Sequence, residues 1–139
     1  MKNIAQSIFT NIAEAEARIH GIRSGGQVHL HELGDTDSIV DIVGAGIAID
    51  ELGIDGVYAS KISMGRSFVK ARHGTLPIPS PASMELLKGV PLEISEIDAE
   101  LVTPTGAGIL KTLAKGFGRM PRMEIERIGY GAGSGELSE

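Results

Sequence analysis

The sequence predicts an α+β fold in which a small mixed sheet packs against three or four helices. Apolar residues recur at helical spacing near the N-terminus, and short alternating segments typical of strands follow them. The 19 glycines and 6 prolines of the 139-residue chain gather between these segments. We expect residues 1–139 to form a single domain, because domains commonly hold about 100–150 residues. The glycine-rich residues 129–139 are expected to form a flexible tail.

The first predicted helix lies at the N-terminus, where apolar side chains share one helical face. These residues are Ile4, Ile8, Ile12, Ala15 and Ile19. Glycines between residues 21 and 26 end this helix. A second helix begins at Asp35 or Asp37, because a carboxylate there can accept hydrogen bonds from free N–H groups. It ends near Leu52, where Gly53 supplies a stop.

Several short segments are expected to be extended. Residues 28–33 form a short strand or an extended loop, and residues 56–62 and 67–73 form strands joined by a turn at 64–66. Residues 75–81 take an extended path without ladder donors, because their alternate prolines have no N–H. The remaining strand candidates are residues 91–97 and 123–128.

Two further helices begin with a hydroxyl residue followed by proline, a pairing that caps and opens a helix. The pair at 80–81 starts a short helix that ends near Gly89. The pair at 103–104 starts a longer helix that ends at Gly116 or Gly118.

The composition excludes several classes of function. The net charge is −5, from 13 Lys and Arg against 18 Asp and Glu, so no broad basic face is available for nucleic acid. The absence of cysteine removes disulfides, thiolate metal sites and a cysteine nucleophile, and it fits a reducing compartment. The longest apolar run, residues 42–49, is far shorter than the ~20 residues that cross a membrane. We therefore expect a cytoplasmic protein without nucleic-acid or membrane partners.

One glycine pattern looks like a nucleotide-binding turn. Residues 40–48 are similar to the start of a dinucleotide-binding unit, but Ile49 stands where that fingerprint needs its third glycine. No acidic residue ends a strand about 20 residues later, as the fingerprint also requires. We predict a helix here, whose glycines allow another backbone to approach closely.

Two histidines and three carboxylates form the richest cluster of chemically active residues. His29 and His31 point to the same side if their segment is a strand, and Glu32 adjoins them. Imidazole and carboxylate together suit Ni²⁺, Zn²⁺ or Fe²⁺. Asp37 and Asp41 share a helix face, and Asp41 stands among apolar residues, where a buried carboxylate needs a partner or a metal. The alternative is a solvated polar loop in which Asp37 only caps the helix.

Two other segments are candidates for holding anions. Arg66, Lys70 and Arg72 share one strand face, where they either bind phosphate or carboxylate groups or guard an edge strand by their charge. The segment 103–108 opens a helix with small and hydroxyl residues, which leaves N–H donors available for an anion. The alternative for that segment is simple capping by Thr103.

Five ordered blocks of the sequence resemble a known family. The first is His29-Leu30-His31-Glu32-Leu33-Gly34, continued by Asp37-Ser38-Ile39-Val40-Asp41. The others are residues 68–79, which include His73-Gly74-Thr75-Leu76-Pro77, and residues 85–91, 100–107 and 125–133. These blocks are similar to those of the LarC-type nickel insertion proteins, and together they span most of the chain.

This resemblance implies a domain of a nickel insertase, of the lyase class. Family members place nickel into pyridinium bisthiocarboxylic acid mononucleotide, using CTP with a divalent cation, and so complete the nickel-pincer cofactor of lactate racemase. Because family members are longer, the chain resembles their central portion. It is expected to form a homo-oligomer or to associate with the rest of the family's chain. The alternative is a non-catalytic metal-binding, ligand-binding or assembly module that is inactive alone.

The resemblance also implies roles for individual residues, although it assigns no catalytic group. Nickel is expected to be held by His29, His31, Glu32 and Asp37, with His73 as a further ligand. The phosphate or the thiocarboxylates of the substrate are expected to be held by Lys70, Arg72, Thr103, Thr105 and Gly106.

Overall fold

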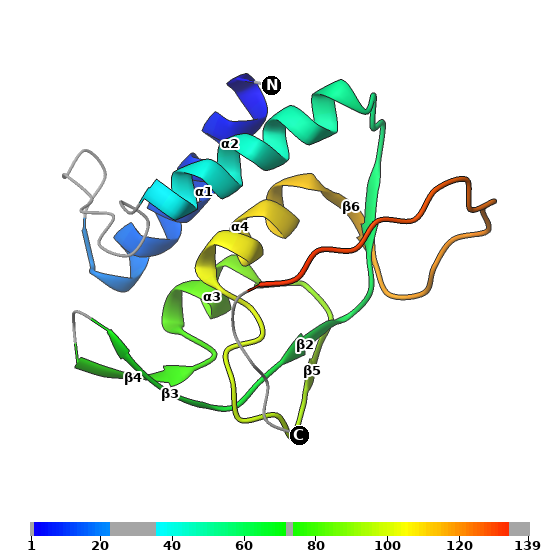
Figure 1. Cartoon of the computed structure of the whole chain (residues 1–139). Helices are drawn as coiled ribbons and strands as arrows, with labels where there is room; N and C mark the ends of the chain where they lie inside the picture. Colours follow the sequence, from blue (N-terminus) through cyan, green and yellow to red (C-terminus); the bar gives the residue numbers. More distant parts are fainter. Residues whose placement is uncertain (1, 23–35, 72–73, 134–139) are drawn as a thin grey trace.

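The computed structural model of the chain describes residues 2–22, 36–71 and 74–133, and it confirms the predicted α+β class (Figure 1). The helices are α1 (Lys2–Ile19), α2 (Thr36–Glu51), α3 (Pro81–Leu86) and α4 (Pro104–Leu113). The strands are β1 (Val57–Ala59), β2 (Ile62–Met64), β3 (Ser67–Ala71), β4 (Gly74–Ile78), β5 (Leu92–Ile94) and β6 (Ala114–Phe117). The helices stack on one another, and the strands lie in pairs around their margin.

The core lies where α1 packs against the other helices. Ile8 and Ile12 of α1 are fully buried, and they meet Ile42 of α2 and Ala107 of α4. Leu87, immediately after α3, is also buried in this cluster. The helical periodicity of the sequence therefore identified the packed face of α1 correctly from Ile4 to Ala15, whereas Ile19 at the end of the helix is 40% exposed.

Two glycines mark the closest approaches between elements. A Cβ atom at Gly108 of α4 would lie 2.5 Å from Cγ1 of Ile12, so α4 can lie this close to α1 only without a side chain there. Gly65, between β2 and β3, is tighter still. A Cβ atom at Gly65 would overlap the carbonyl oxygen of Ala99 and lie 3.0 Å from its carbonyl carbon.

Residues 57–64 form an extended run that changes partner halfway. β1 pairs in parallel with β6, and β2 pairs in parallel with β5. The sequence predicted a single strand over 56–62, but residues 60 and 61 separate β1 from β2. The interruption has a physical cause: each half of the run hydrogen-bonds to a different segment, so the ladder cannot continue across the change.

The hairpin in the structure differs from the predicted one. β3 pairs antiparallel with β4, whereas the predicted turn at 64–66 connects β2 to β3 without pairing them. β4 includes Pro77, which stands opposite Phe68. Proline is tolerated in a strand that has one neighbour, as β4 has among the described strands, because its missing N–H can face the other side. The predicted extended path is therefore confirmed for residues 75–78, whereas the prediction that this segment has no ladder donors is wrong for β4.

The predicted end of one helix and one predicted strand are also wrong. The helix that starts at residue 104 ends at Leu113, because Ala114 is already extended (φ −71°, ψ 122°) and begins β6. The predicted strand over 123–128 does not form, and residues 121–133 carry no helix or strand. Within the described ranges this segment has no neighbouring strand to satisfy its backbone groups, so alternation alone did not make it a strand.

α2 confirms the prediction that the glycine-containing segment 40–48 is a helix rather than a nucleotide-binding turn. It ends before Gly53, whose φ of 61° is the left-handed conformation that glycine adopts at a helix end. Across the three described ranges, no helix is long and apolar enough to cross a membrane. The expectations of a single domain and of a flexible tail at 129–139 stay predictions.

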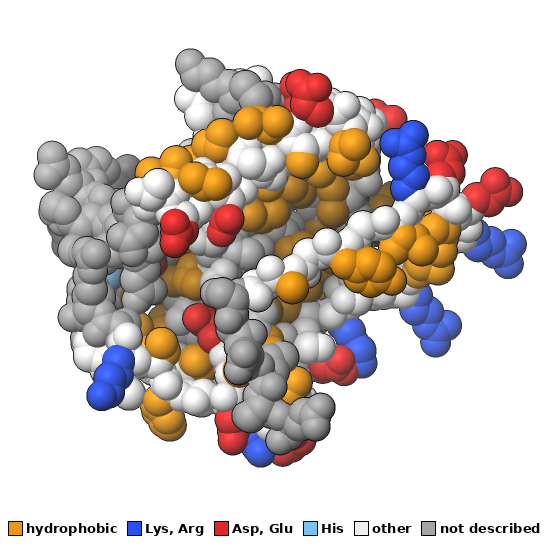
Figure 2. All heavy atoms as spheres, viewed as in Figure 1, with side chains coloured by type: hydrophobic (Ala, Val, Ile, Leu, Met, Phe, Trp, Pro, Cys, Tyr) orange, Lys and Arg blue, Asp and Glu red, His pale blue; other side chains and the backbone are white. Residues whose placement is uncertain are grey.

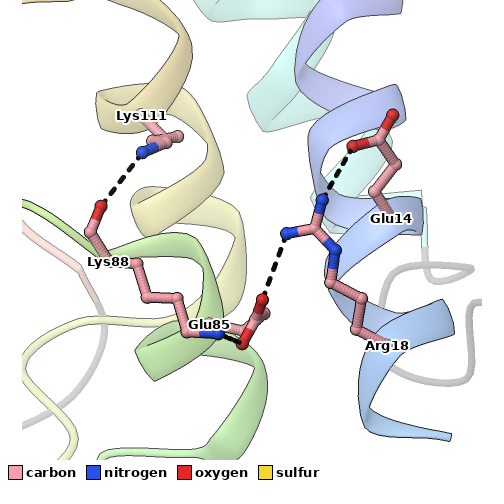
Figure 3. Close-up of polar contacts among 5 residues, drawn as sticks. All are labelled: Glu14, Arg18, Glu85, Lys88 and Lys111. Atoms are coloured by element: carbon pink, nitrogen blue, oxygen red, sulfur yellow. Dashed lines mark hydrogen bonds and ion pairs between the residues drawn. The ribbon is translucent and has the colours of Figure 1, made fainter. Parts of the chain in front are cut away.

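Charged side chains connect α1, α3 and α4 on the protein surface (Figure 3). Glu85 of α3 accepts a hydrogen bond from Arg18 of α1 at 3.1 Å and pairs with Lys88, while Arg18 also contacts Glu14 at 3.5 Å. Lys111 of α4 donates to the backbone carbonyl of Lys88 at 3.1 Å. The pKa of the Glu85 carboxyl lies below its usual range, chiefly because of the hydrogen bond from Lys88 and then that from Arg18.

Glu85→Gln is expected to lower the free energy of unfolding at neutral pH. It should also reduce the loss of that free energy as the pH falls into the acid range. A carboxyl whose pKa is lowered by folding stabilises the folded state above its unfolded pKa. That contribution is lost as the pH falls below the unfolded pKa of a glutamate, about 4.3, and through the lower folded pKa. Urea unfolding at several pH values measures the effect. Glu14→Gln is the control, because this more exposed carboxylate also pairs with Arg18 and should contribute little. Equal pH profiles for wild type and Glu85→Gln would contradict the expectation.

Candidate functional site

The first turns of α2 and α4 meet through a side-chain hydrogen bond. Thr105 of α4 is 9% exposed, and its hydroxyl donates to the hydroxyl of Ser38 of α2 at 3.3 Å. Asp37, one of the predicted metal ligands, directly precedes Ser38. The structure thus brings together part of the predicted metal block and the predicted anion-binding helix start, although they lie far apart in the sequence.

The start of α4 has the predicted cap. Thr103 adopts an extended conformation (φ −79°, ψ 160°), and its hydroxyl oxygen accepts a hydrogen bond from the N–H of Gly106 at 3.1 Å. The N–H of Ala107 donates to the carbonyl of Thr103 at 2.9 Å. The capping alternative for Thr103 therefore describes what its side chain does in this structure. Binding of the substrate by Thr103, Thr105 and Gly106 stays a prediction.

The carboxylates of α2 are exposed. Asp37 lies in the first turn of the helix rather than at its cap, and a negative charge there interacts favourably with the helix dipole. Asp41, one turn further, is also exposed, so the need of a buried carboxylate for a partner or a metal does not arise there. The reason is the phase of the helix: Ile42 faces the core, whereas Val40 is 62% exposed beside Asp41. Both carboxylates are accessible to an ion from solution.

Most of the predicted metal ligands lie outside the part of the chain that the structure describes. His29, His31, Glu32 and His73 lie outside the described residues, as does Arg72. In the ranges that the structure describes, no three His, Asp or Glu side chains are close enough together to hold a metal ion. The metal block therefore stays a prediction from the sequence, to which the structure adds the accessibility of Asp37.

The predicted cationic strand face is only partly formed by β3. Phe68 and Lys70 both point to the exposed side of the strand, as the alternation predicts, and Phe68 is 74% exposed. Arg66 precedes the strand and is engaged elsewhere, with Glu96 at 2.7 Å and Asp98 at 3.2 Å. Lys70 thus remains a candidate for holding an anion, while the charge of Arg66 is balanced by acidic neighbours.

Ser38 was missing from the predicted set of site residues. Its role depends on a contact with Thr105, 67 positions away in the sequence, which no local pattern shows. The one signal in the sequence is its place beside Asp37, in the first turn of a predicted helix where polar side chains face free N–H groups.

Comparison with known proteins gives a consistent result over the whole chain. A family model described as "Nickel insertion protein" matches residues 1–139. The chain is 51% identical over 139 residues to a "Putative nickel insertion protein" of Geotalea daltonii, covering 100% of this chain and 35% of that protein. It is 50% identical over 139 residues to a protein of the same name from Geobacter metallireducens, with the same coverage of 100% and 35%.

A third relative carries a more specific name. The chain is 49% identical over 138 residues to the "Pyridinium-3,5-bisthiocarboxylic acid mononucleotide nickel insertion protein" of Desulfitobacterium hafniense, covering 99% of this chain and 34% of that protein. The chain thus spans about a third of the length of the curated relatives that it matches. No solved structure matches it.

Proposed function

Because the chain belongs to the nickel insertion protein family, we propose that it takes part in inserting nickel into a pyridinium-3,5-bisthiocarboxylic acid mononucleotide. The observation that carries the proposal is the family match over all 139 residues. It is supported by 49% identity to a relative whose name states this substrate. In this reaction nickel and the mononucleotide are both substrates, so the chain needs one place for a divalent ion and another for an anionic molecule.

We assign the handling of nickel to His29, His31, Glu32 and Asp37, with His73 as a further ligand. Imidazole nitrogen and carboxylate oxygen are suitable ligands for Ni²⁺. Asp37 supports the assignment because its carboxylate is exposed at the start of α2 and therefore accessible to an incoming ion. These residues bind nickel reversibly, because a cargo ion must leave them for the sulfur atoms of the substrate.

The start of α4 lies beside the first turn of α2, which carries Asp37, and it is the proposed grip for the anionic groups of a nucleotide. Thr103, Thr105 and Gly106 form its first turn, where the helix dipole favours a negative charge. The hydrogen bond between Thr105 and Ser38 supports the assignment, because it holds this turn against the turn that carries Asp37. Lys70 and Arg72 add positive charge in the proposal.

The proposal also covers the cellular setting and the other reactants of the whole protein. CTP and a divalent cation act with nickel, the protein is cytoplasmic, and it works as a homo-oligomer or together with the remaining two thirds of the family's chain. A second candidate function is a metal-binding or assembly module without activity of its own. The observation that favours it is the share of the relatives that the chain spans, about one third.

A calorimetric titration of Ni²⁺ into the metal-free chain tests the assignment of nickel. We expect about one binding site, which disappears in the His29→Ala/His31→Ala variant because nickel loses two of its three proposed imidazole ligands. The matched control is His20→Ala, which removes a histidine outside the block. Circular dichroism establishes that each variant is folded. Equal binding in all three proteins, or no binding in any of them, would remove the metal role from these histidines and favour the second candidate.

A further inference from the structure

A pocket of about 550 Å³ opens at the carboxyl ends of β1 and β6, at the opposite end of α4 from its first turn. The two strands run in parallel, so both of their carboxyl ends lie at this edge. The N–H of Gly118 donates to the carbonyl of Ala59 at 2.8 Å and fixes the point where the chain leaves β6. Residues 119–121 and Met123 complete the lining before the chain turns back toward the helices (Figure 1).

The walls of this pocket are aromatic and thioether side chains. Tyr58 of β1 is 57% exposed, and Met120 and Met123 are 70% and 54% exposed. Phe117 of β6 adds a second ring. Exposed apolar side chains gather over this part of the surface (Figure 2). Aromatic rings and methionine sulfur both favour contact with a flat ring, and the sulfur adapts to ligands of differing shape.

The position of the Tyr58 ring depends on a glycine. A Cβ atom at Gly116 would lie 3.2 Å from Cδ1 and 3.3 Å from Cε1 of Tyr58, closer than ordinary contact allows. The ring therefore lies directly against the backbone of β6. This support keeps one side of the ring packed while the rest stays open to the pocket.

The charge of the lining favours an anion. Among the described residues that line the pocket, Arg119 is the one charged residue and none is a carboxylate. Arg119 forms none of the ion pairs found between residues that the structure describes. The chain as a whole has a net charge of −5, whereas the described lining of this pocket is positively charged. An anion is therefore favoured here over the rest of the surface.

We propose that this pocket binds a nucleotide, with the heteroaromatic ring against Tyr58 and the phosphate on Arg119. Its volume lies within the roughly 300–1,000 Å³ of small-molecule sites. The choice of a nucleotide rests on the proposed function, which requires a pyridinium mononucleotide and CTP. The pocket gives this chain a second place for an anionic ligand, besides the start of α4, where the hydroxyls of Thr103 and Thr105 are already engaged.

The two tyrosines and the absence of tryptophan provide a specific test. With ring-labelled tyrosine, an NMR spectrum reports on Tyr58 in the pocket and on Tyr130, which is 97% exposed and lies outside the lining. The probes are nicotinate mononucleotide, cytidine monophosphate and ribose 5-phosphate. The first two carry different rings on a ribose phosphate, and the third carries no ring.

We expect the Tyr58 signals to shift saturably at about 1 mM nicotinate mononucleotide, while the Tyr130 signals stay in place. Arg119→Gln should weaken binding about tenfold, because a charged hydrogen bond to phosphate is lost. Arg122→Gln is the matched control and should leave affinity unchanged, since this arginine does not line the pocket. Gly116→Ala should weaken binding by displacing the Tyr58 ring.

The three probes distinguish which class of nucleotide the pocket binds. A response to nicotinate mononucleotide alone assigns the pocket to the pyridinium substrate, and a response to cytidine monophosphate assigns it to pyrimidine nucleotides or to nucleotides in general. No shift of Tyr58 with either nucleotide would overturn the proposal, as would equal shifts of both tyrosines or equal affinity in Arg119→Gln. Nickel binding by the same samples separates this failure from that of the proposed function, because nickel titration does not depend on the pocket.

Discussion

Gly65→Ala is expected to lower the free energy of unfolding by about 3 kcal/mol. The added Cβ atom would overlap the carbonyl oxygen of Ala99, which belongs to the backbone and cannot rotate away as a side chain would. The segment around Ala99 is also fixed by the hydrogen bond from the N–H of Arg66 to the carbonyl of Ile97, at 3.0 Å. Relief of the overlap therefore requires β2 and the chain after β5 to separate.

Urea unfolding followed by circular dichroism measures this loss. Gly44→Ala is the control, because Gly44 is exposed on α2 and a Cβ atom at this position would meet no other atom within 4 Å. Alanine favours a helix over glycine by about 0.8–1.0 kcal/mol, so this variant should be slightly more stable than wild type. Unchanged stability in Gly65→Ala would mean that residues 97–99 do not lie against Gly65 in solution.

Ile12→Ala is expected to cost about 3 kcal/mol, within the range for large-to-small substitutions in a core. Ile12 is fully buried between α1 and α4, and its loss leaves a cavity opposite Gly108, where no side chain can fill it. Ile39→Ala is the matched control. Ile39 is 45% exposed on α2, so its truncation should change stability far less.

A double variant tests whether the loss of stability comes from the contact between Ile12 and Gly108. Gly108→Ala alone should destabilise the chain by about 1–3 kcal/mol, because its Cβ atom would lie 2.5 Å from Cγ1 of Ile12. Combined with Ile12→Ala, the new methyl group occupies part of the cavity. The two effects should therefore sum to more than the cost of the double variant. Simple additivity would show that α4 does not pack on α1 through these two residues.

Features that depend on neighbouring residues in the sequence were predicted well. Ser80 and Thr103 were identified as caps, and each accepts the hydrogen bond from a nearby N–H that defines a cap. The packed face of α1 followed from spacing alone, with Ile8 and Ile12 fully buried. Both kinds of feature are decided within a few residues, so the sequence carries the whole signal.

Features that depend on distant residues were predicted poorly. β6 was assigned to a helix because Ala114 to Phe117 directly follow one, and only their pairing with β1 makes them a strand. The same limit applies to the site. The chemistry of Thr105 and Asp37 suggested anion and metal binding separately, but their proximity depends on how α2 and α4 pack, which local spacing does not determine.

α4 spans the distance between the two proposed ligand sites. Its 10 residues form a rod about 15 Å long, with Thr103 at one end and β6 attached to the other without a linker. Because no residue separates Leu113 from Ala114, the length of this helix sets how far Gly116, and the ring of Tyr58 that rests on it, lie from Thr103. The spacing between the two proposed sites is therefore fixed by a hydrogen-bonded helix and not by a loop.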